Sequence, residues 1–258
     1  MKGKPIQNQT SVNRENPAKG QGVRKLKMTD QAPDCEIVIN RPLYNLVDLV
    51  KEKNVVDIGC GYGRNQSIVE SVGGQWTGVE PFEGGANTVI GDAENLPFED
   101  DLFDVAIMDA VLEHIPDVGK AFSEVARVLK PQGIFIGYVA FMECFHEISY
   151  SHLSFKALEH YAKINDMKLE KVAGGSAFGI DYHMRVLFYP IPFKLMRKFM
   201  AFMIRSLFKF KSRLAYLGLR YKRKLSKSEA KETSTLYFKL ECLRQSNGFF
   251  YIIRKNSN

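Results

Sequence analysis

The sequence is poor in cysteine, and its few cysteines are scattered along the chain. The four of them form no Cys-x-x-Cys pair and have no histidine neighbour at ligand spacing: Cys35, Cys60, Cys144 and Cys242. This pattern argues against a structural zinc site, and we expect no bound metal. The polar N-terminal residues lack the apolar stretch of a secretory signal. We therefore expect a reduced, cytoplasmic protein.

Acidic residues are missing from a long segment in the second half of the chain. Between Tyr182 and Ser228 there are 13 Lys and Arg residues and no Asp or Glu, and residues 1–28 contain seven basic residues and one Glu. The formal net charge of +7 therefore combines two basic segments with an acidic body. We predict a disordered basic tail over residues 1–28. We also predict one domain over residues 29–258, with a basic helical insertion at about 182–228.

Between these segments, short apolar strands alternate with amphipathic helices. The spacing predicts strands at 54–58, 75–79, 88–90, 103–108, 134–139 and 167–172, and helices at 42–53, 64–72, 118–130 and 155–163. Alternation of this kind predicts a doubly wound α/β fold with a mostly parallel sheet. Ligands then bind at the carboxyl ends of the strands, where Asp57, Glu80, Asp92 and Asp109 are expected.

A glycine-rich turn follows the first of these strands, in the stretch Val55-Val-Asp-Ile-Gly-Cys-Gly-Tyr-Gly-Arg-Asn65. A dinucleotide-binding fingerprint places its third glycine five positions after the first. Counted from Gly59, that position is Arg64, and the glycines instead stand at 59, 61 and 63. This spacing disfavours a dinucleotide, although a nicotinamide-dependent reductase remains an alternative.

Five ordered blocks resemble the class I S-adenosylmethionine-dependent methyltransferases, in particular the small-molecule branch that includes quinone-biosynthesis enzymes. The blocks are Val55–Gly63, Gly78–Glu80, Gly91–Phe98, Phe103–Ile107 and Val111–Gly133. The resemblance covers roughly residues 42–172. It implies a Rossmann-like, seven-stranded sheet with its last strand near Phe249–Ile253, after the basic insertion.

The resemblance also implies the residues that bind the cofactor, S-adenosylmethionine. Gly59, Gly61 and Gly63 would let the backbone approach its methionine part, and Asp57 would support the loop and the amino group. Glu80, 21 residues after Gly59, would accept both ribose hydroxyls.

The adenine and sulfonium contacts follow from the same resemblance. Asp92 and the Ala93 amide would contact the adenine edge, and Asp109 and Ala110 would lie near the sulfonium. Phe82 would cover the adenine face, although only eight residues separate Glu80 from Val89, too few for the usual helix. Asp57 and Asp92 also suit a second interpretation, in which each only stabilises a turn.

Two histidines are candidates for a catalytic base. His114 follows the fourth predicted strand and His152 follows the fifth, so both loops open over the expected site. Histidine suits proton transfer near neutral pH. The alternative is that His114 only caps or packs the next helix. Tyr150 is a further candidate for orienting the acceptor.

The basic insertion contains an amphipathic segment, Phe193–Phe210. Its charged residues share one helical face, and its apolar residues share the other: Leu195, Met196, Phe199, Phe202, Met203, Leu207 and Phe210. Lysines interrupt every apolar run well short of the ~20 residues of a spanning helix. The segment is interpreted as a lid, as a grip for an anionic substrate, or as an interfacial helix that contacts an anionic membrane through Phe193–Lys224.

The combined hypothesis is methyl transfer from S-adenosylmethionine to a small-molecule acceptor of lipid-linked, isoprenoid or glycan type. A nucleic-acid acceptor is less favoured, because there is no Asn-Pro-Pro-Tyr-type block of the amino-directed enzymes. A non-enzymatic alternative is a cofactor-binding or membrane-docked interaction protein with the same fold.

Overall fold

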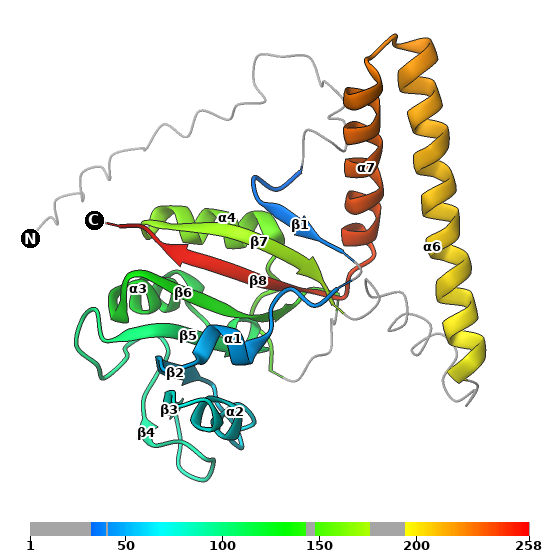
Figure 1. Cartoon of the computed structure of the whole chain (residues 1–258). Coiled ribbons are helices and arrows are strands. Elements are labelled where there is room, and N and C mark those ends of the chain that lie inside the picture. Colours follow the sequence, from blue (N-terminus) through cyan, green and yellow to red (C-terminus); the bar gives the residue numbers. More distant parts are fainter. Residues whose placement is uncertain (1–31, 40, 143–147, 176–193, 258) are drawn as a thin grey trace, which may run out of the picture.

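The computed structural model describes residues 32–39, 41–142, 148–175 and 194–257, so the predicted tail at 1–28 lies outside them. Within these ranges eight strands form one sheet in the order β1-β7-β8-β6-β5-β2-β3-β4 (Figure 1). They are β1 (Glu36–Val38), β2 (Asn54–Ile58), β3 (Gln75–Glu80), β4 (Val89–Ile90), β5 (Phe103–Asp109), β6 (Leu129–Ala140), β7 (Met167–Gly174) and β8 (Gly248–Lys255). Neighbouring strands are parallel except for β8, which is antiparallel to both β6 and β7.

The predicted doubly wound sheet is confirmed, and the predicted number of seven strands is wrong by one. The additional strand is β1, which pairs with the outer side of β7. It has three residues, too few for an alternating pattern to appear in the sequence. Strand β6 also begins earlier than predicted, because Leu129 already pairs with Phe103 of β5.

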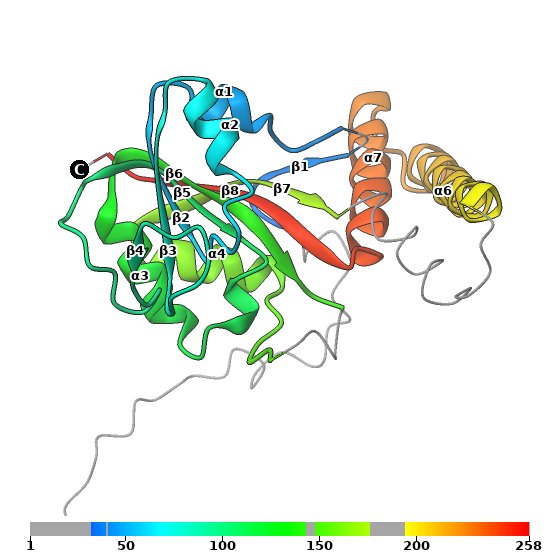
Figure 2. The same cartoon turned by 90° about the horizontal axis from the view of Figure 1, so that it is seen from below.

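Helices cover both faces of the sheet (Figure 2). One face carries α1 (Leu46–Val50) and α2 (Gln66–Ser71), both shorter than predicted, and the other carries α3 (Val118–Val128) and α4 (Phe155–Ile164). Both α3 and α4 have a side-chain N-cap, since Asp117 accepts a hydrogen bond from the Lys120 amide and Ser154 accepts one from the Ala157 amide. Alternate residues of β2 and β5 enter the two apolar cores on opposite faces of the sheet.

Two long helices stand at one end of the sheet (Figures 1 and 2). Helix α6 (Lys194–Leu217) continues into a π-helical turn, η4 (Gly218–Lys222), and α7 (Lys227–Arg244) follows. Ser226 and Glu229 form a reciprocal capping box at the start of α7. Helix α7 was not predicted from the sequence, and the first part of the predicted insertion, residues 182–193, lies outside the described residues.

Helix α7 connects α6 to the body of the protein. Leu240 and Leu243 of α7 belong to the main apolar core, whereas Phe238 and Cys242 pack against Phe208 of α6. Because both of its sides are covered, α7 lacks a single apolar stripe. No helix in the described ranges is long and apolar enough to cross a membrane.

Candidate functional site

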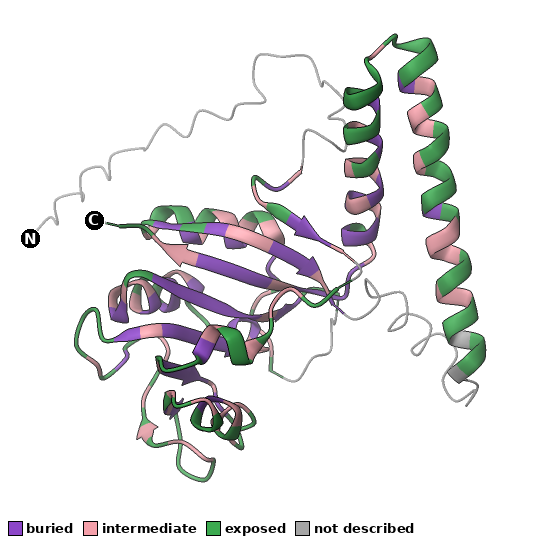
Figure 3. Ribbon diagram, viewed as in Figure 1, coloured by how far each residue is buried: buried purple, intermediate pink, exposed green. Residues whose placement is uncertain are grey.

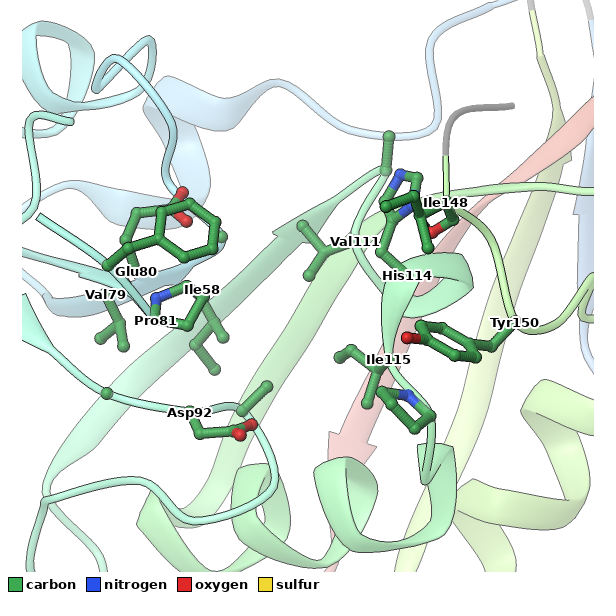
Figure 4. A pocket seen from close by; sticks show the side chains of 16 residues that line it. Ile58, Val79, Glu80, Pro81, Asp92, Val111, His114, Ile115, Ile148 and Tyr150 are labelled. Carbon is green, nitrogen blue, oxygen red and sulfur yellow. The ribbon is translucent and has the colours of Figure 1, made fainter. Parts of the chain in front are cut away.

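A cavity of about 610 Å³ lies at the carboxyl ends of β2, β3 and β5 (Figure 4). One wall comes from the glycine turn and the ends of β3 and β4, and it includes Gly59, Glu80, Phe82, Asp92 and Ala93. The facing wall comes from the segment after β5 and the loop before α4, and it includes Ala110, Val111, His114, Ile115, Ile148 and Tyr150. The first wall carries the two carboxylates of the cavity lining, Glu80 and Asp92, and the second wall is mostly apolar, so the cavity can hold two chemically different groups.

The glycine turn requires glycine for two reasons. Gly59, Gly61 and Gly63 all have positive φ angles, of 71°, 53° and 70°. A Cβ on Gly59 would also lie 2.4 Å from Val111 Cγ2, and one on Gly63 would lie 2.6 Å from Ala86 Cβ. The turn therefore presents bare backbone beside the cavity, as binding of a ligand against the main chain requires.

Asp57 is buried beneath this turn, with only 2% of its surface exposed. Its Oδ2 accepts hydrogen bonds from Asn65 Nδ2 and from Trp76 Nε1, each at 3.2 Å. Burial raises the pKa of Asp57 to about 6, while these two hydrogen bonds act in the opposite direction. Asp57 thus ties the start of α2 and strand β3 to the glycine turn, and it does not line the cavity itself.

Glu80 connects the end of β3 to the same turn. Its Oε1 accepts a hydrogen bond of 2.5 Å from the Gly61 amide, and the residue also lines the cavity. A carboxylate can accept several hydrogen bonds, so Glu80 can hold the turn and still accept from a ligand.

Asp92 and Ala93 line the cavity after β4. Asp92 Oδ1 accepts a hydrogen bond of 2.8 Å from the Glu94 amide, so this residue does stabilise a local turn while it faces the cavity. Phe82 is 69% exposed and lies in a segment, residues 81–88, that forms bends and no helix. The sequence-based doubt about room for a helix here is therefore confirmed.

Asp109 and Ala110 end β5 beside the glycine turn. Asp109 forms an ion pair with Arg64, and burial raises the pKa of Asp109 while Arg64 opposes that rise. The charge of Asp109 also adds to the effect of burial on the pKa of Tyr44, which is well above its ordinary value. Ala110 has a positive φ of 59° and lines the cavity.

The structure separates the two candidate histidines. His114 lines the cavity, and its Nδ1 lies 2.8 Å from the carbonyl oxygen of Ile148. A carbonyl oxygen can only accept, so Nδ1 carries the proton and Nε2 carries the lone pair in the neutral ring. His152 is exposed and does not line the cavity. The catalytic role of either residue stays a prediction.

Several residues of the site were absent from the sequence-based selection. Trp76 and Asn65 hold Asp57, and Arg64 binds Asp109. Arg64 could have been selected from the sequence, because it directly follows the third glycine of the turn. It was considered only as the residue that stands where a dinucleotide-binding pattern has its third glycine. No local pattern marks Ile115 and Ile148, because the apolar wall is assembled from segments that are distant in sequence.

Comparison with known proteins distinguishes between the cofactor classes. Residues 56–137 match the family model described as a methyltransferase domain. Residues 56–137 therefore form a methyltransferase domain. This segment includes the glycine turn, Glu80, Asp92 and His114, so it contributes to both walls of the cavity, whereas Ile148 and Tyr150 of the second wall lie outside it.

Curated relatives of this methyltransferase domain include a sterol methyltransferase and a phthiotriol/phenolphthiotriol dimycocerosates methyltransferase. The chain is 34% identical over 108 residues to the sterol 4-C-methyltransferase strm-1 of Caenorhabditis elegans, covering 36% of this chain and 32% of that protein. It is 32% identical over 124 residues to the phthiotriol/phenolphthiotriol dimycocerosates methyltransferase of Mycobacterium tuberculosis, covering 43% and 46%. The chain thus spans about a third to a half of the length of these relatives.

Solved structures share the fold of this methyltransferase domain. One belongs to the complex between the Haloferax volcanii Trm112 methyltransferase activator and a candidate methyltransferase, with a TM-score of 0.52, 15% identity, and 83% and 88% of the two chains covered. Another is a candidate sarcosine dimethylglycine methyltransferase from Galdieria sulphuraria, with a TM-score of 0.50, 16% identity and 82% of each chain covered. At these identities the likeness concerns the fold alone.

Proposed function

We propose that this protein transfers a methyl group from S-adenosylmethionine to an apolar, lipid-type acceptor. The observation that carries the proposal is the cavity with two unlike walls, one that carries the carboxylates of Glu80 and Asp92 and one that is mostly apolar and surrounds His114 (Figure 4). Lipid-like acceptors are supported by the names of the two curated relatives, a sterol and a phthiotriol dimycocerosates methyltransferase.

The residues of the wall that carries Glu80 and Asp92 fit the cofactor. The backbone of Gly59 packs against Val111, where any side chain would collide, and it lines the cavity, so the main chain of the turn can face the methionine part. Glu80 is suited to accept from the two ribose hydroxyls, and Asp92 with the Ala93 amide is suited to the adenine edge. When bound, S-adenosylmethionine supplies an electrophilic methyl group on a sulfonium.

The apolar wall would bind and orient the acceptor. Val111, Ile115 and Ile148 give it an apolar surface, and Tyr150 adds a hydroxyl group that can orient a polar atom of the acceptor. Methyl transfer is a direct displacement, so alignment of the acceptor and exclusion of water contribute most of the rate enhancement.

His114 would act as the base where the acceptor must lose a proton. Its Nδ1 donates to the Ile148 carbonyl, which fixes the tautomer with the lone pair on Nε2. The backbone carbonyl of Glu113 accepts from the amides of Tyr150 and Ser151, which holds the loop beside His114. These contacts hold the His114 imidazole in a fixed position relative to the apolar wall that would bind the acceptor.

Transfer of a labelled methyl group to cell extracts tests the proposal. The protein would be incubated with methyl-labelled S-adenosylmethionine and separate lipid, glycan and RNA fractions. We expect label in the lipid fraction, and less of it with the H114Q variant. Label confined to RNA or glycan would contradict the lipid acceptor. Tight cofactor binding without transfer to any fraction would favour the non-enzymatic alternative.

A further inference from the structure

One side of α6 is apolar along its whole length and faces solvent (Figure 3). We call the following residues the outer face of α6: Leu195, Phe199, Phe202, Met203, Leu207, Phe210, Leu214 and Leu217. Every one of them is exposed, with Leu195 at 82% and Phe202 at 63%. A monomeric soluble protein rarely exposes a continuous apolar surface of this length, so the outer face indicates a binding surface.

The side of α6 opposite the outer face packs against α7 and so fixes the orientation of the helix. Met200, Ala201, Ile204 and Phe208 pack in an apolar cluster with Phe238 and Cys242 of α7. Ser212 Oγ also donates a hydrogen bond of 2.6 Å to the Ser234 carbonyl of α7. Because α7 is itself anchored in the main core, α6 holds its outer face away from the body. This differs from the lid interpretation, in which the apolar side would be covered by the protein.

Basic side chains accompany the outer face. At about 100° per residue, Lys198 and Lys209 lie along one border of it, Arg213 lies within it at the same angle as Leu195, and all three are exposed. Four further basic residues follow at the end of the helix, at positions 220 and 222–224, and these are exposed as well. The sequence contains no Asp or Glu between residues 182 and 228 that could neutralise them.

We propose that the outer face of α6 docks on the surface of a bilayer that contains anionic lipid. An interfacial helix buries an apolar face at the boundary of headgroups and acyl chains, while basic residues at its border bind anionic headgroups. A second copy of the chain fits less well, because two α6 helices would bring like charges together with no acids on the helix to offset them. The docking goes beyond methyl transfer and does not depend on it.

Helix α6 stands at the end of the sheet where β7 finishes. Strand β7 points toward α7 and α6 in both views (Figures 1 and 2). Docking through the outer face of α6 would therefore turn this end of the sheet toward the bilayer, with α7 between α6 and the main core.

Sedimentation with vesicles tests the docking. The full chain would be spun with phosphatidylcholine vesicles, with and without phosphatidylglycerol. We expect the wild type to sediment with the mixed vesicles and to stay in solution with phosphatidylcholine alone. Since each basic residue near an anionic surface contributes roughly a five-fold gain in partitioning, K198Q/K209Q/R213Q should bind roughly 100-fold more weakly. We expect F199Q/F202Q/F210Q to lose at least about ten-fold.

A matched control is available on the body of the protein. Ile164 is 59% exposed and Lys168 is exposed, and neither lies on α6 or α7, so I164Q/K168Q should bind vesicles as the wild type does. The three α6 aromatic residues are exposed, so their variant should keep the wild-type circular dichroism and melting temperature. Wild type that stays in solution with mixed vesicles, or α6 variants that sediment like the wild type, would overturn the proposal. A lipid-free dimer that F199Q/F202Q/F210Q abolishes would assign the face to a second copy instead.

Discussion

Arg64 and Asp109 form an ion pair that joins the glycine turn to the end of β5. The side chain of Arg64 is 75% exposed, whereas that of Asp109 is 33% exposed. Asp109 therefore gains a counter-charge in a partly buried place, and Arg64 remains accessible at the end of the turn. In the proposed complex the methionine carboxylate would lie near this turn, within the range of the guanidinium.

The first prediction concerns Arg64. If Arg64 binds the methionine carboxylate, R64A should weaken the binding of S-adenosylhomocysteine about ten-fold, since hydrogen bonds to charged groups contribute roughly 1.5–3 kcal/mol. Binding of 5′-methylthioadenosine, which lacks the amino acid part, should change little. Calorimetric titration of both ligands measures the difference, with R64K as the matched variant that keeps the charge. An equal loss for both ligands would show that Arg64 acts only through the shape of the turn.

The second prediction concerns the pH dependence of stability at Asp57. Its folded pKa of about 6 lies above the ordinary value of 3.8, so the folded state binds this proton more tightly than the unfolded state. The stabilisation from the protonated form is complete below about pH 3.8 and is lost as the pH rises through about 6. The unfolding free energy of the wild type minus that of D57N should thus fall by roughly 2 kcal/mol from about pH 4 to about pH 7. Urea titrations across this range measure it, and a difference that does not vary with pH would contradict the raised pKa.

The third prediction compares two glycines in the same turn. Both have positive φ angles, but a Cβ on Gly59 would meet Val111 at 2.4 Å whereas a Cβ on Gly61 would meet nothing within 4 Å. G61A should therefore lose about 1–2 kcal/mol of unfolding free energy, the cost of the left-handed conformation alone. G59A should lose roughly 1–3 kcal/mol more, because of the collision. Equal losses in denaturant titrations would show that the turn can relax around the added methyl group.

The fourth prediction distinguishes the two histidines. H114Q should lower kcat about 10²-fold or more if the acceptor must be deprotonated, and it should leave cofactor affinity unchanged. H152Q should leave kcat near the wild-type value, since His152 does not line the cavity. The reverse ranking of the two variants would assign the base to His152.

The strands and their terminal acids could be predicted from the sequence, because each depends on a local pattern. The apolar run from Val55 to Ile58 and the glycines after it determine both a strand and a tight turn within a few residues. Strand β1 could not be predicted in this way, because three residues are too few to show an alternation of apolar and polar side chains. Its place in the sheet depends on pairing with β7, more than 130 residues later.

The two long helices show a second limit of sequence analysis. The helical spacing of residues in α6 separates an apolar face from a charged one. This spacing does not show which face packs against the rest of the protein. Helix α7 packs against the side of α6 that carries Met200, Ile204 and Phe208, and Phe202 on the other side of α6 is exposed. Helix α7 is buried on two sides, so its sequence has no single apolar stripe from which the helix could be predicted.

Cofactor binding by Glu80 variants tests the account most directly. Isothermal titration calorimetry would compare S-adenosylmethionine, S-adenosylhomocysteine and NADH on wild type, E80Q and E80A. The account predicts binding of the first two ligands and none of NADH. E80Q should lose about ten-fold or more in affinity, because a neutral amide is a weaker acceptor for the ribose hydroxyls, and E80A should lose at least as much. Binding of NADH in place of S-adenosylmethionine, or unchanged affinity in both variants, would contradict it.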